Sequence, residues 1–325
     1  MFSGPFLRRP ADAPGLSPFT YGVLALSIGA AFLVQSHSGI WLRIPAFQWL
    51  TPALVLAGVA CLSAVAPRSS HLLAVPAVLA VLSIQLLCTI VLAYGVQAFA
   101  FPLRDDLLIA ADRALGFDWL TFQTFMVERS GVMDVLGLCY DTFFLQVILI
   151  PLVLAALGEV RLADRYVSAF IVCGTIMVAV SGVLPATGAA GLVGPDGLHL
   201  LFHGATPLTD LFALRDGTMR TIVLAEVGPM ISFPSLHCSV AYLATAVFWS
   251  RSRLRWAMVF LNSVMTVSAV THGAHYVCDC LAGLLVAAGS FHVAGWLGPV
   301  SRGVVARAHG DAVPSAAPAS TALAV

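Results

Sequence analysis

The sequence has 325 residues, of which 59% are hydrophobic and only 10% charged, and its mean hydropathy is +0.94. These values exclude an ordinary soluble domain and are typical of a polytopic membrane protein. The formal net charge is zero and no basic block is present, so nothing indicates a nucleic-acid partner. The seven cysteines lie in apolar runs without the spacing of a disulfide framework, and we interpret them as packing residues.

Apolar runs recur along the chain, each close to the roughly 20 residues that a membrane-spanning helix needs. They predict an all-α polytopic membrane bundle with about eight spans. The second run is the weakest, because it is short and Pro52 permits a re-entrant or interfacial segment. The runs lie at about 19–35, 50–66, 71–100, 132–157, 165–186, 233–250, 254–271 and 275–298.

The chain divides into three parts by composition. Residues 1–70 hold a Pro- and Gly-rich tail and two extra candidate spans, and residues 71–300 hold a core of six helices. Residues 301–325 are rich in Ala, Pro and Ser, and we expect them to be disordered.

Two polar segments interrupt the predicted core. In segment 101–131 charged residues alternate with apolar ones and with Trp119, which predicts a helix lying in the membrane interface, a plain connecting loop being the alternative. Segment 187–230 is the longest polar insertion, and it either covers a site or is an ordinary external loop.

The arginines predict the orientation of the bundle. With the N-terminus inside, ten of the sixteen arginines fall in inner segments and six in outer ones, as the positive-inside rule favours. The cluster at 251–255 supplies much of the excess. Segments 101–131 and 187–230 then face outward, which we expect to be the periplasmic face of a bacterial inner membrane.

One stretch near the end of the chain places an acid and a base on one face of a predicted helix. His275 and Asp279 are four residues apart, which is about one helical turn. The carboxylate can accept one ring N–H, fix the tautomer and leave the other nitrogen free to react. Ionisable groups are costly at the edge of a lipid-facing helix, so the pair indicates either a function or an interhelical hydrogen bond.

A second histidine opens the sixth predicted span. Pro234 marks a helix start, Ser235 can cap the helix, and the free N–H groups there form an anion site beside His237. Because an inner turn at 251–255 joins spans six and seven, the hairpin returns His237 and His275 to one membrane face. Two histidines, a carboxylate and a helix N-terminus suit phosphoryl transfer through a phosphohistidine.

These runs resemble the histidine motifs of a known family. Pro-Ser-Leu-His at 234–237 and His-Tyr-Val-Cys-Asp at 275–279 are similar to the motifs of the type 2 phosphatidic acid phosphatase superfamily. The stretch Asp-Arg-Ala-Leu-Gly-Phe-Asp-Trp at 112–119 resembles, more weakly, the branch that includes inositol phosphorylceramide synthase. The resemblance implies a six-helix catalytic core at about 71–298 that acts on membrane lipids and needs no metal or other cofactor.

The same resemblance implies a role for each motif residue. His275 would be the nucleophile, Asp279 its orienting carboxylate and His237 the general acid, while Ser235 would help to bind phosphate.

The sequence departs from the wider superfamily where phosphate-binding cations are usual. Ala269 stands where the third motif has Arg, and the run 184–187 replaces the first motif with its Lys and Arg. The inositol phosphorylceramide synthase branch is similarly relaxed. Candidates to supply the missing charge are His272, Arg215 and Arg220.

We therefore expect a lipid phosphotransferase that moves a phosphoryl headgroup from a phospholipid to a lipid hydroxyl. Simple hydrolysis by a lipid phosphate phosphatase shares every named residue and differs in whether a second pocket holds an acceptor and excludes water. The non-enzymatic alternative is a lipid transporter whose His–Asp pair relays protons.

Overall fold

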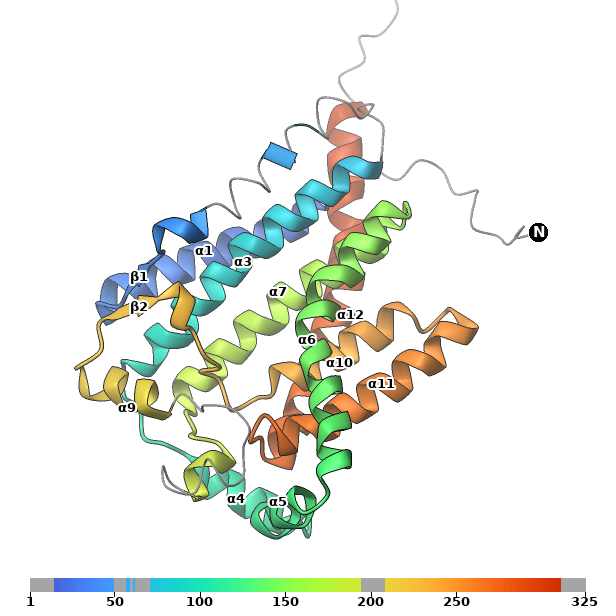
Figure 1. Cartoon of the computed structure of the whole chain (residues 1–325). Coiled ribbons are helices and arrows are strands. Elements are labelled where there is room, and N and C mark those ends of the chain that lie inside the picture. Colours follow the sequence, from blue (N-terminus) through green and yellow to red (C-terminus); the bar gives the residue numbers. More distant parts are fainter. Residues whose placement is uncertain (1–14, 50–56, 59–60, 62–70, 194–207, 311–325) are drawn as a thin grey trace, which may run out of the picture.

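The computed structural model describes residues 15–49, 57–58, 61, 71–193 and 208–310. These residues form a helical bundle with a single two-stranded sheet, which confirms the predicted all-α membrane fold (Figure 1). The helices are α1 (Pro18–Ser38), α3 (Ala74–Gln97), α4 (Asp105–Ala114), α5 (Trp119–Val127), α6 (Ser130–Ala156), α7 (Val160–Val183), α9 (Leu208–Asp216), α10 (Leu236–Val247), α11 (Ser252–Thr271) and α12 (Val277–Gly310).

Short elements fill the connections between the helices. Strand β1 pairs in parallel with β2 and so ties the segment after α1 to the segment after α9. These elements are β1 (Trp41–Arg43), β2 (Thr221–Val223) and the 3₁₀ turns Ala46–Trp49, His71–Leu73, Ala189–Leu192 and Leu224–Glu226.

Among the described residues, six helices are long and apolar enough to cross a membrane, namely α1, α3, α6, α7, α11 and α12. The chain is therefore a multi-pass membrane protein. Of the eight predicted runs, the second, at 50–66, falls almost wholly outside the described residues.

The sixth predicted span is shorter than expected. Helix α10 has only 12 residues, about 18 Å of helix, where the apolar run 233–250 predicted a full span. The apolar count included the loop before Ser235 and the turn at Phe248, and neither is helical.

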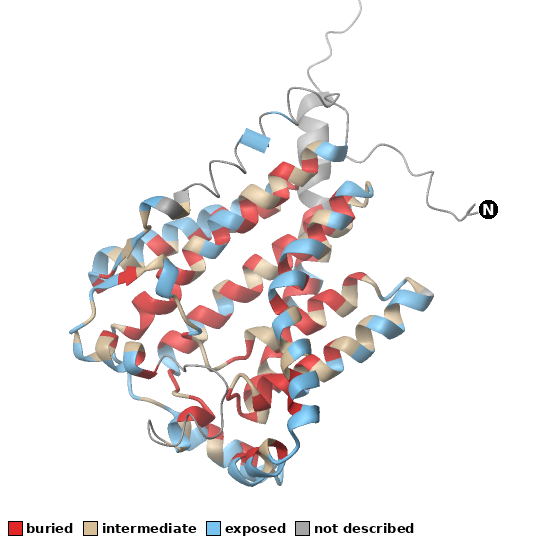
Figure 2. Cartoon of the chain, viewed as in Figure 1, coloured by how far each residue is buried: buried red, intermediate tan, exposed pale blue. Residues whose placement is uncertain are grey.

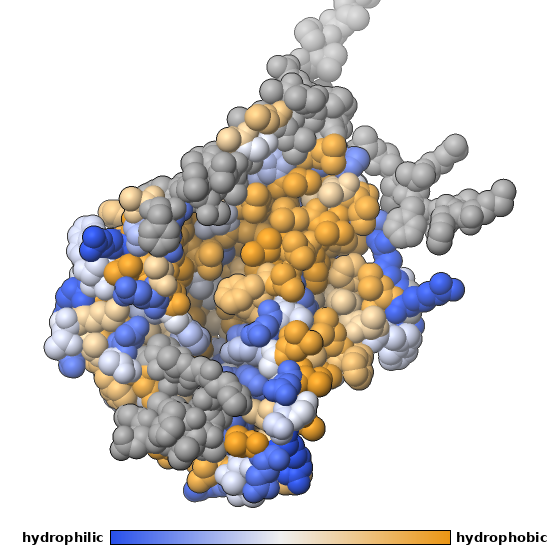
Figure 3. All heavy atoms as spheres, in the orientation of Figure 1, coloured by the Kyte–Doolittle hydropathy of each residue, from blue (hydrophilic) through white to orange (hydrophobic). Residues whose placement is uncertain are grey.

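Helix α7 forms the centre of the bundle. In its most apolar window 61% of the residues are buried, against 22–44% for the other long helices. Figure 2 shows this buried strip running through the middle of the molecule, with exposed residues along the outer helices. Many exposed side chains on those helices are large and apolar, as lipid contact requires, and hydrophobic residues gather over the middle and upper right of the view in Figure 3.

Helices α1 and α3 lie side by side in the same direction. Near their C-terminal ends, Gly95 of α3 faces Val34 and Ser38 of α1. At the other end, the Asp164 carboxylate of α7 accepts hydrogen bonds from the hydroxyls of Ser17, which caps α1, and of Thr20 in its first turn. This contact fixes the start of α1 against the central helix.

The segment 101–131 forms two short helices where one was predicted. Helix α4 ends at Ala114, Gly116 takes a positive φ of 76°, and Asp118 caps α5 by accepting a hydrogen bond from the Thr121 amide. A glycine tolerates this backbone conformation because it lacks Cβ, so the chain turns sharply here.

Helix α12 extends into the segment 301–325 that the composition predicted to be disordered. Helix α12 continues to Gly310, ten residues beyond residue 300, where the Ala- and Pro-rich composition led us to expect disorder. The remainder, 311–325, lies outside the described residues, as do His199 and His203 of the long polar insertion.

Helices α4 and α5 cross one end of the bundle. At this end α3, α7 and α11 finish and α6, α10 and α12 begin (Figure 1). The polar loops that the sequence places next to its histidines therefore meet at a single end of the molecule.

Candidate active site

The His275–Asp279 pair forms at the start of α12. His275 precedes the helix in a turn where Ala274 takes a positive φ of 52°, and the His275 side chain is 6% exposed. Its Nδ1 lies 3.3 Å from Asp279 Oδ2, as the four-residue spacing predicted. With Nδ1 at the carboxylate, Nε2 is the ring nitrogen left for chemistry.

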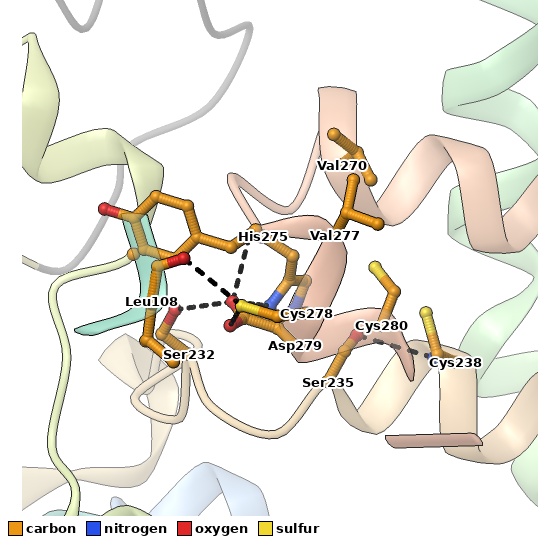
Figure 4. A network of polar contacts seen from close by, with 12 residues as sticks. Leu108, Ser232, Ser235, Cys238, Val270, His275, Val277, Cys278, Asp279 and Cys280 are labelled. Carbon is orange, nitrogen blue, oxygen red and sulfur yellow. Dashed lines mark hydrogen bonds and ion pairs between the residues drawn. The ribbon is translucent and has the colours of Figure 1, made fainter. Parts of the chain in front are cut away.

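The Asp279 carboxylate accepts several hydrogen bonds at this end of the bundle. It is fully buried, and besides His275 it accepts the Tyr276 amide at 3.0 Å and the Ser232 hydroxyl at 3.4 Å. Figure 4 shows His275, Ser232 and Cys278 converging on it. Several donors hold this side chain in one orientation, which keeps the imidazole oriented too.

Helix α10 starts against the first turns of α12. Ser235 caps α10, since its hydroxyl accepts from the Cys238 amide, while its own amide donates to the Asp279 carbonyl at 3.0 Å. Gly283 of α12 allows this approach, because a Cβ there would lie 2.3 Å from the Ser235 carbonyl oxygen. The predicted cap is thus present, and phosphate binding by Ser235 stays a prediction.

His237 lies in the first turn of α10, in an aromatic setting that the sequence did not reveal. Its ring stacks on Tyr140 of α6 at 3.9 Å between centroids with an interplanar angle of 14°, and Phe143 lies at 4.3 Å. The ring centroids of His237 and His275 are 6.5 Å apart. The two histidines, distant in sequence, therefore lie close together at one end of the bundle, as the sequence predicted.

His272 joins this cluster from the end of α11. Its Nδ1 lies 2.9 Å from the Thr271 hydroxyl, and its ring centroid is 6.0 Å from that of Tyr140. Tyr140 therefore lies near both His237 and His272, which keeps His272 a candidate for contact with substrate.

The two candidate arginines contact other parts of the chain. Arg215 donates to the Phe101 carbonyl at 2.6 Å and Arg220 to the Ser38 carbonyl at 3.0 Å. Burial lowers the pKa of Arg215, which lies outside the spans. In the structure both groups hold loops together, so their predicted role in binding phosphate would require these contacts to change.

Helix α4 contributes two carboxylates that sequence reasoning did not connect with the site. Asp105 accepts from the Thr187 amide and hydroxyl, from the Gly188 amide and from the Tyr276 hydroxyl. Burial, reinforced by the Asp105 charge, raises the pKa of Tyr276, so the phenol stays protonated and donates. Asp112 accepts from backbone amides of α12.

The spacing of Asp105 and Asp112 is the feature of the sequence that could have pointed to them. Asp105 and Asp112 are seven residues apart, which places them on one face of a helix. The same pattern also suits an interfacial helix, and the partners lie more than 80 residues away, so local periodicity cannot name them. Asp105 thereby holds Thr187, the last residue of the run 184–187, and the neighbouring Gly188.

Most of the region that contains the site matches a known protein family. Residues 106–293 match the PAP2 superfamily, which is more than half of the chain. The chain belongs to the PAP2 superfamily. The matched region runs from the first turn of α4 into α12 and contains all the histidines and carboxylates described above except Asp105. A search of curated proteins and a search of solved structures gave no match.

Membership in the PAP2 superfamily indicates the general type of activity. Proteins of this superfamily are generally phosphatase-type enzymes, and one embedded in a membrane would act on lipid substrates. The matched range begins at residue 106 and therefore includes nearly all of α4 and the whole of α5.

Proposed function

We propose that the protein is a lipid phosphotransferase that works through a phosphohistidine on His275. The observation that carries the proposal is the meeting of His237, His275 and Asp279 at one end of the bundle, with 6.5 Å between the two imidazole centroids. Reacting atoms approach within about 3–3.5 Å before bond formation, so a phosphorus centre between the rings can be reached from both sides.

In the first proposed step, Nε2 of His275 attacks phosphorus while the P–O bond to the diacylglycerol portion breaks. Protonated His237 gives its proton to the departing oxygen. In the second step, a hydroxyl of an acceptor lipid gives its proton to His237 and forms the new O–P bond, and the N–P bond breaks. Asp279 holds His275 and stabilises the positive charge that develops on its ring.

The surroundings of the pair favour a phosphodiester donor over a phosphomonoester. A monoester carries close to two negative charges at pH 7 and a diester carries one. In the part of the chain that the structure describes, the loops of the pair are held by the carboxylates Asp105 and Asp112, while buried Ala269 takes the place of the usual Arg. A site with carboxylates nearby and without that Arg accommodates the single negative charge of a phospholipid diester more readily than the two charges of a monoester.

We place the site at the outer, periplasmic face of a bacterial inner membrane. The arginine distribution supports this, because the cluster at 251–255 lies at the opposite end of α11 from His272. Figure 3 shows the surface hollowed between α9 and α6, on a face rich in hydrophobic residues. Such a recess suits a lipid substrate that enters from the membrane.

The test is acceptor dependence of the purified protein in detergent micelles. We expect phosphatidylinositol labelled at phosphorus to give a labelled ceramide product when ceramide is present, and little release of label when it is absent. Release of labelled inositol phosphate without acceptor would support hydrolysis and reject transfer.

Two variants identify the source of the activity. His275→Ala should abolish turnover, whereas His292→Ala, an exposed histidine on the same helix, should leave it intact. Lipid movement across vesicles without any turnover would favour the transporter instead.

A further inference from the structure

The first turn of α12 needs outside partners for its backbone amides. The opening amides of an α-helix have no acceptor within the helix. Here the Tyr276 amide donates to the Asp279 side chain, as in a capping box, at 3.0 Å. The next two amides, those of Val277 and Cys278, donate to Asp112 of α4, each at 2.9 Å.

Both carboxylate oxygens of Asp112 are used by these two amides. Asp112 is 3% exposed, its Oδ2 accepts a hydrogen bond from the Val277 amide, and its Oδ1 accepts one from the Cys278 amide. Charge-assisted bonds are stronger than neutral ones, and a carboxylate at a helix N-terminus interacts favourably with the helix dipole. Asp112 therefore caps α12 from another helix, 165 residues earlier in the chain.

The turn capped in this way is the one that presents the catalytic carboxylate. Asp279 follows Cys278 directly, and its contact with His275 Nδ1 is 3.3 Å, near the long limit for a hydrogen bond. A small rotation of the turn would break that contact. The Asp279 backbone carbonyl also accepts from Ser235, so the same turn sets the distance to α10.

We propose that Asp112 is a positioning residue of the His275–Asp279 pair. It acts through the first turn of α12, whose orientation fixes the Asp279 carboxylate and, through it, the imidazole. This inference rests on the proposed phosphohistidine chemistry, which supplies the activity to be measured. It gives the segment 101–131 a role in catalysis beyond contact with the membrane interface.

The test compares substitutions at Asp112 with one at Asp106, an exposed carboxylate in the first turn of the same helix. With labelled phosphatidylinositol and ceramide in micelles, Asp112→Ala should lower kcat by about ten- to a hundredfold, as expected for a misplaced catalytic group, with little change in KM. The kcat of Asp112→Asn should lie between those of Asp112→Ala and wild type, because the single side-chain oxygen of Asn accepts one of the two amides. Asp106→Ala should match wild type.

Two further measurements distinguish positioning from general destabilisation. If Asp112 acts through Asp279, the double variant Asp112→Ala/Asp279→Asn should have the kcat of Asp279→Asn alone, because effects of coupled residues are not additive. Hydrogen exchange should quicken at the amides of 277–278 in Asp112→Ala and stay slow in Asp106→Ala.

The positioning role would be overturned if the fold-loss in kcat of the double variant equalled the product of the losses of the two single variants. It would also be overturned if Asp112→Ala and Asp106→Ala had the same kcat. Either result would leave the proposed function standing. Full turnover by His275→Ala would instead remove the proposed function itself.

Discussion

At the scale of single residues, the two histidines occupy different surroundings. His275 is buried and has a carboxylate partner, whereas His237 is partly exposed and packs against aromatic rings. A nucleophile benefits from a fixed tautomer, and a group that exchanges protons with substrate benefits from access to it. The different surroundings agree with the different roles that we propose.

Tyr140 tests the proposed role of His237. Its ring stacks on the imidazole, so Tyr140→Ala should free His237 to rotate and should lower kcat by about tenfold or more, within the range that general acid–base catalysis contributes. Tyr140→Phe keeps the ring and should retain most of the activity. Steady-state turnover measures both, and an unaffected Tyr140→Ala would argue against a fixed His237.

At the scale of the elements, the site depends on how closely α10 approaches α12. Ser239 of α10 donates its hydroxyl to the Gly283 carbonyl at 2.8 Å, and the Ser235 amide donates to the Asp279 carbonyl at 3.0 Å. Both bonds need a backbone without a side chain at position 283. The close approach of α10 to α12 therefore depends on the glycine at position 283.

Two alanine substitutions on α12 test this contact. Gly283→Ala would place Cβ against the Ser235 carbonyl oxygen and should cost about 1–3 kcal/mol of stability, as overpacking typically does. Gly289→Ala has no heavy atom within 4 Å of the new Cβ and should be neutral or slightly stabilising, because alanine favours helix. Thermal unfolding in detergent measures both. Equal melting temperatures would contradict the close approach.

At the scale of the whole molecule, the site end and the end with the 251–255 cluster should face opposite sides of the membrane. Asp106 is exposed on α4 at the site end, and Arg253 is exposed at the start of α11. An impermeant maleimide should label Asp106→Cys from the outer side of sealed vesicles and Arg253→Cys only after permeabilisation. The reverse pattern would place the chemistry on the inner face.

Much of the bundle could be predicted because its signals are local. Apolar run lengths identified the helices, the spacing of His275 and Asp279 gave their contact, and Pro234 with Ser235 marked the start of α10. The turn at 251–255 between two spans also predicted that His237 and His275 lie at one end. Each of these inferences needs only helix geometry and a span of membrane thickness.

The rest could not be predicted because it depends on tertiary pairing. The contacts of Asp112 with α12 and of Tyr140 with His237 join residues roughly a hundred or more positions apart. Arg215 and Arg220 seemed available for phosphate until the fold placed their side chains on the Phe101 and Ser38 carbonyls. Periodicity gives the face of a helix but not the neighbour of that face.

The measurement that tests the account most directly is the trapping of a covalent intermediate on His275. Wild-type protein quenched during turnover of phosphorus-labelled phosphatidylinositol should carry label that is stable to base and lost in acid, as a phosphohistidine is. We predict that His275→Ala carries none and that His292→Ala carries as much as wild type. Label that persists in His275→Ala, or turnover without any labelled protein, would contradict the account.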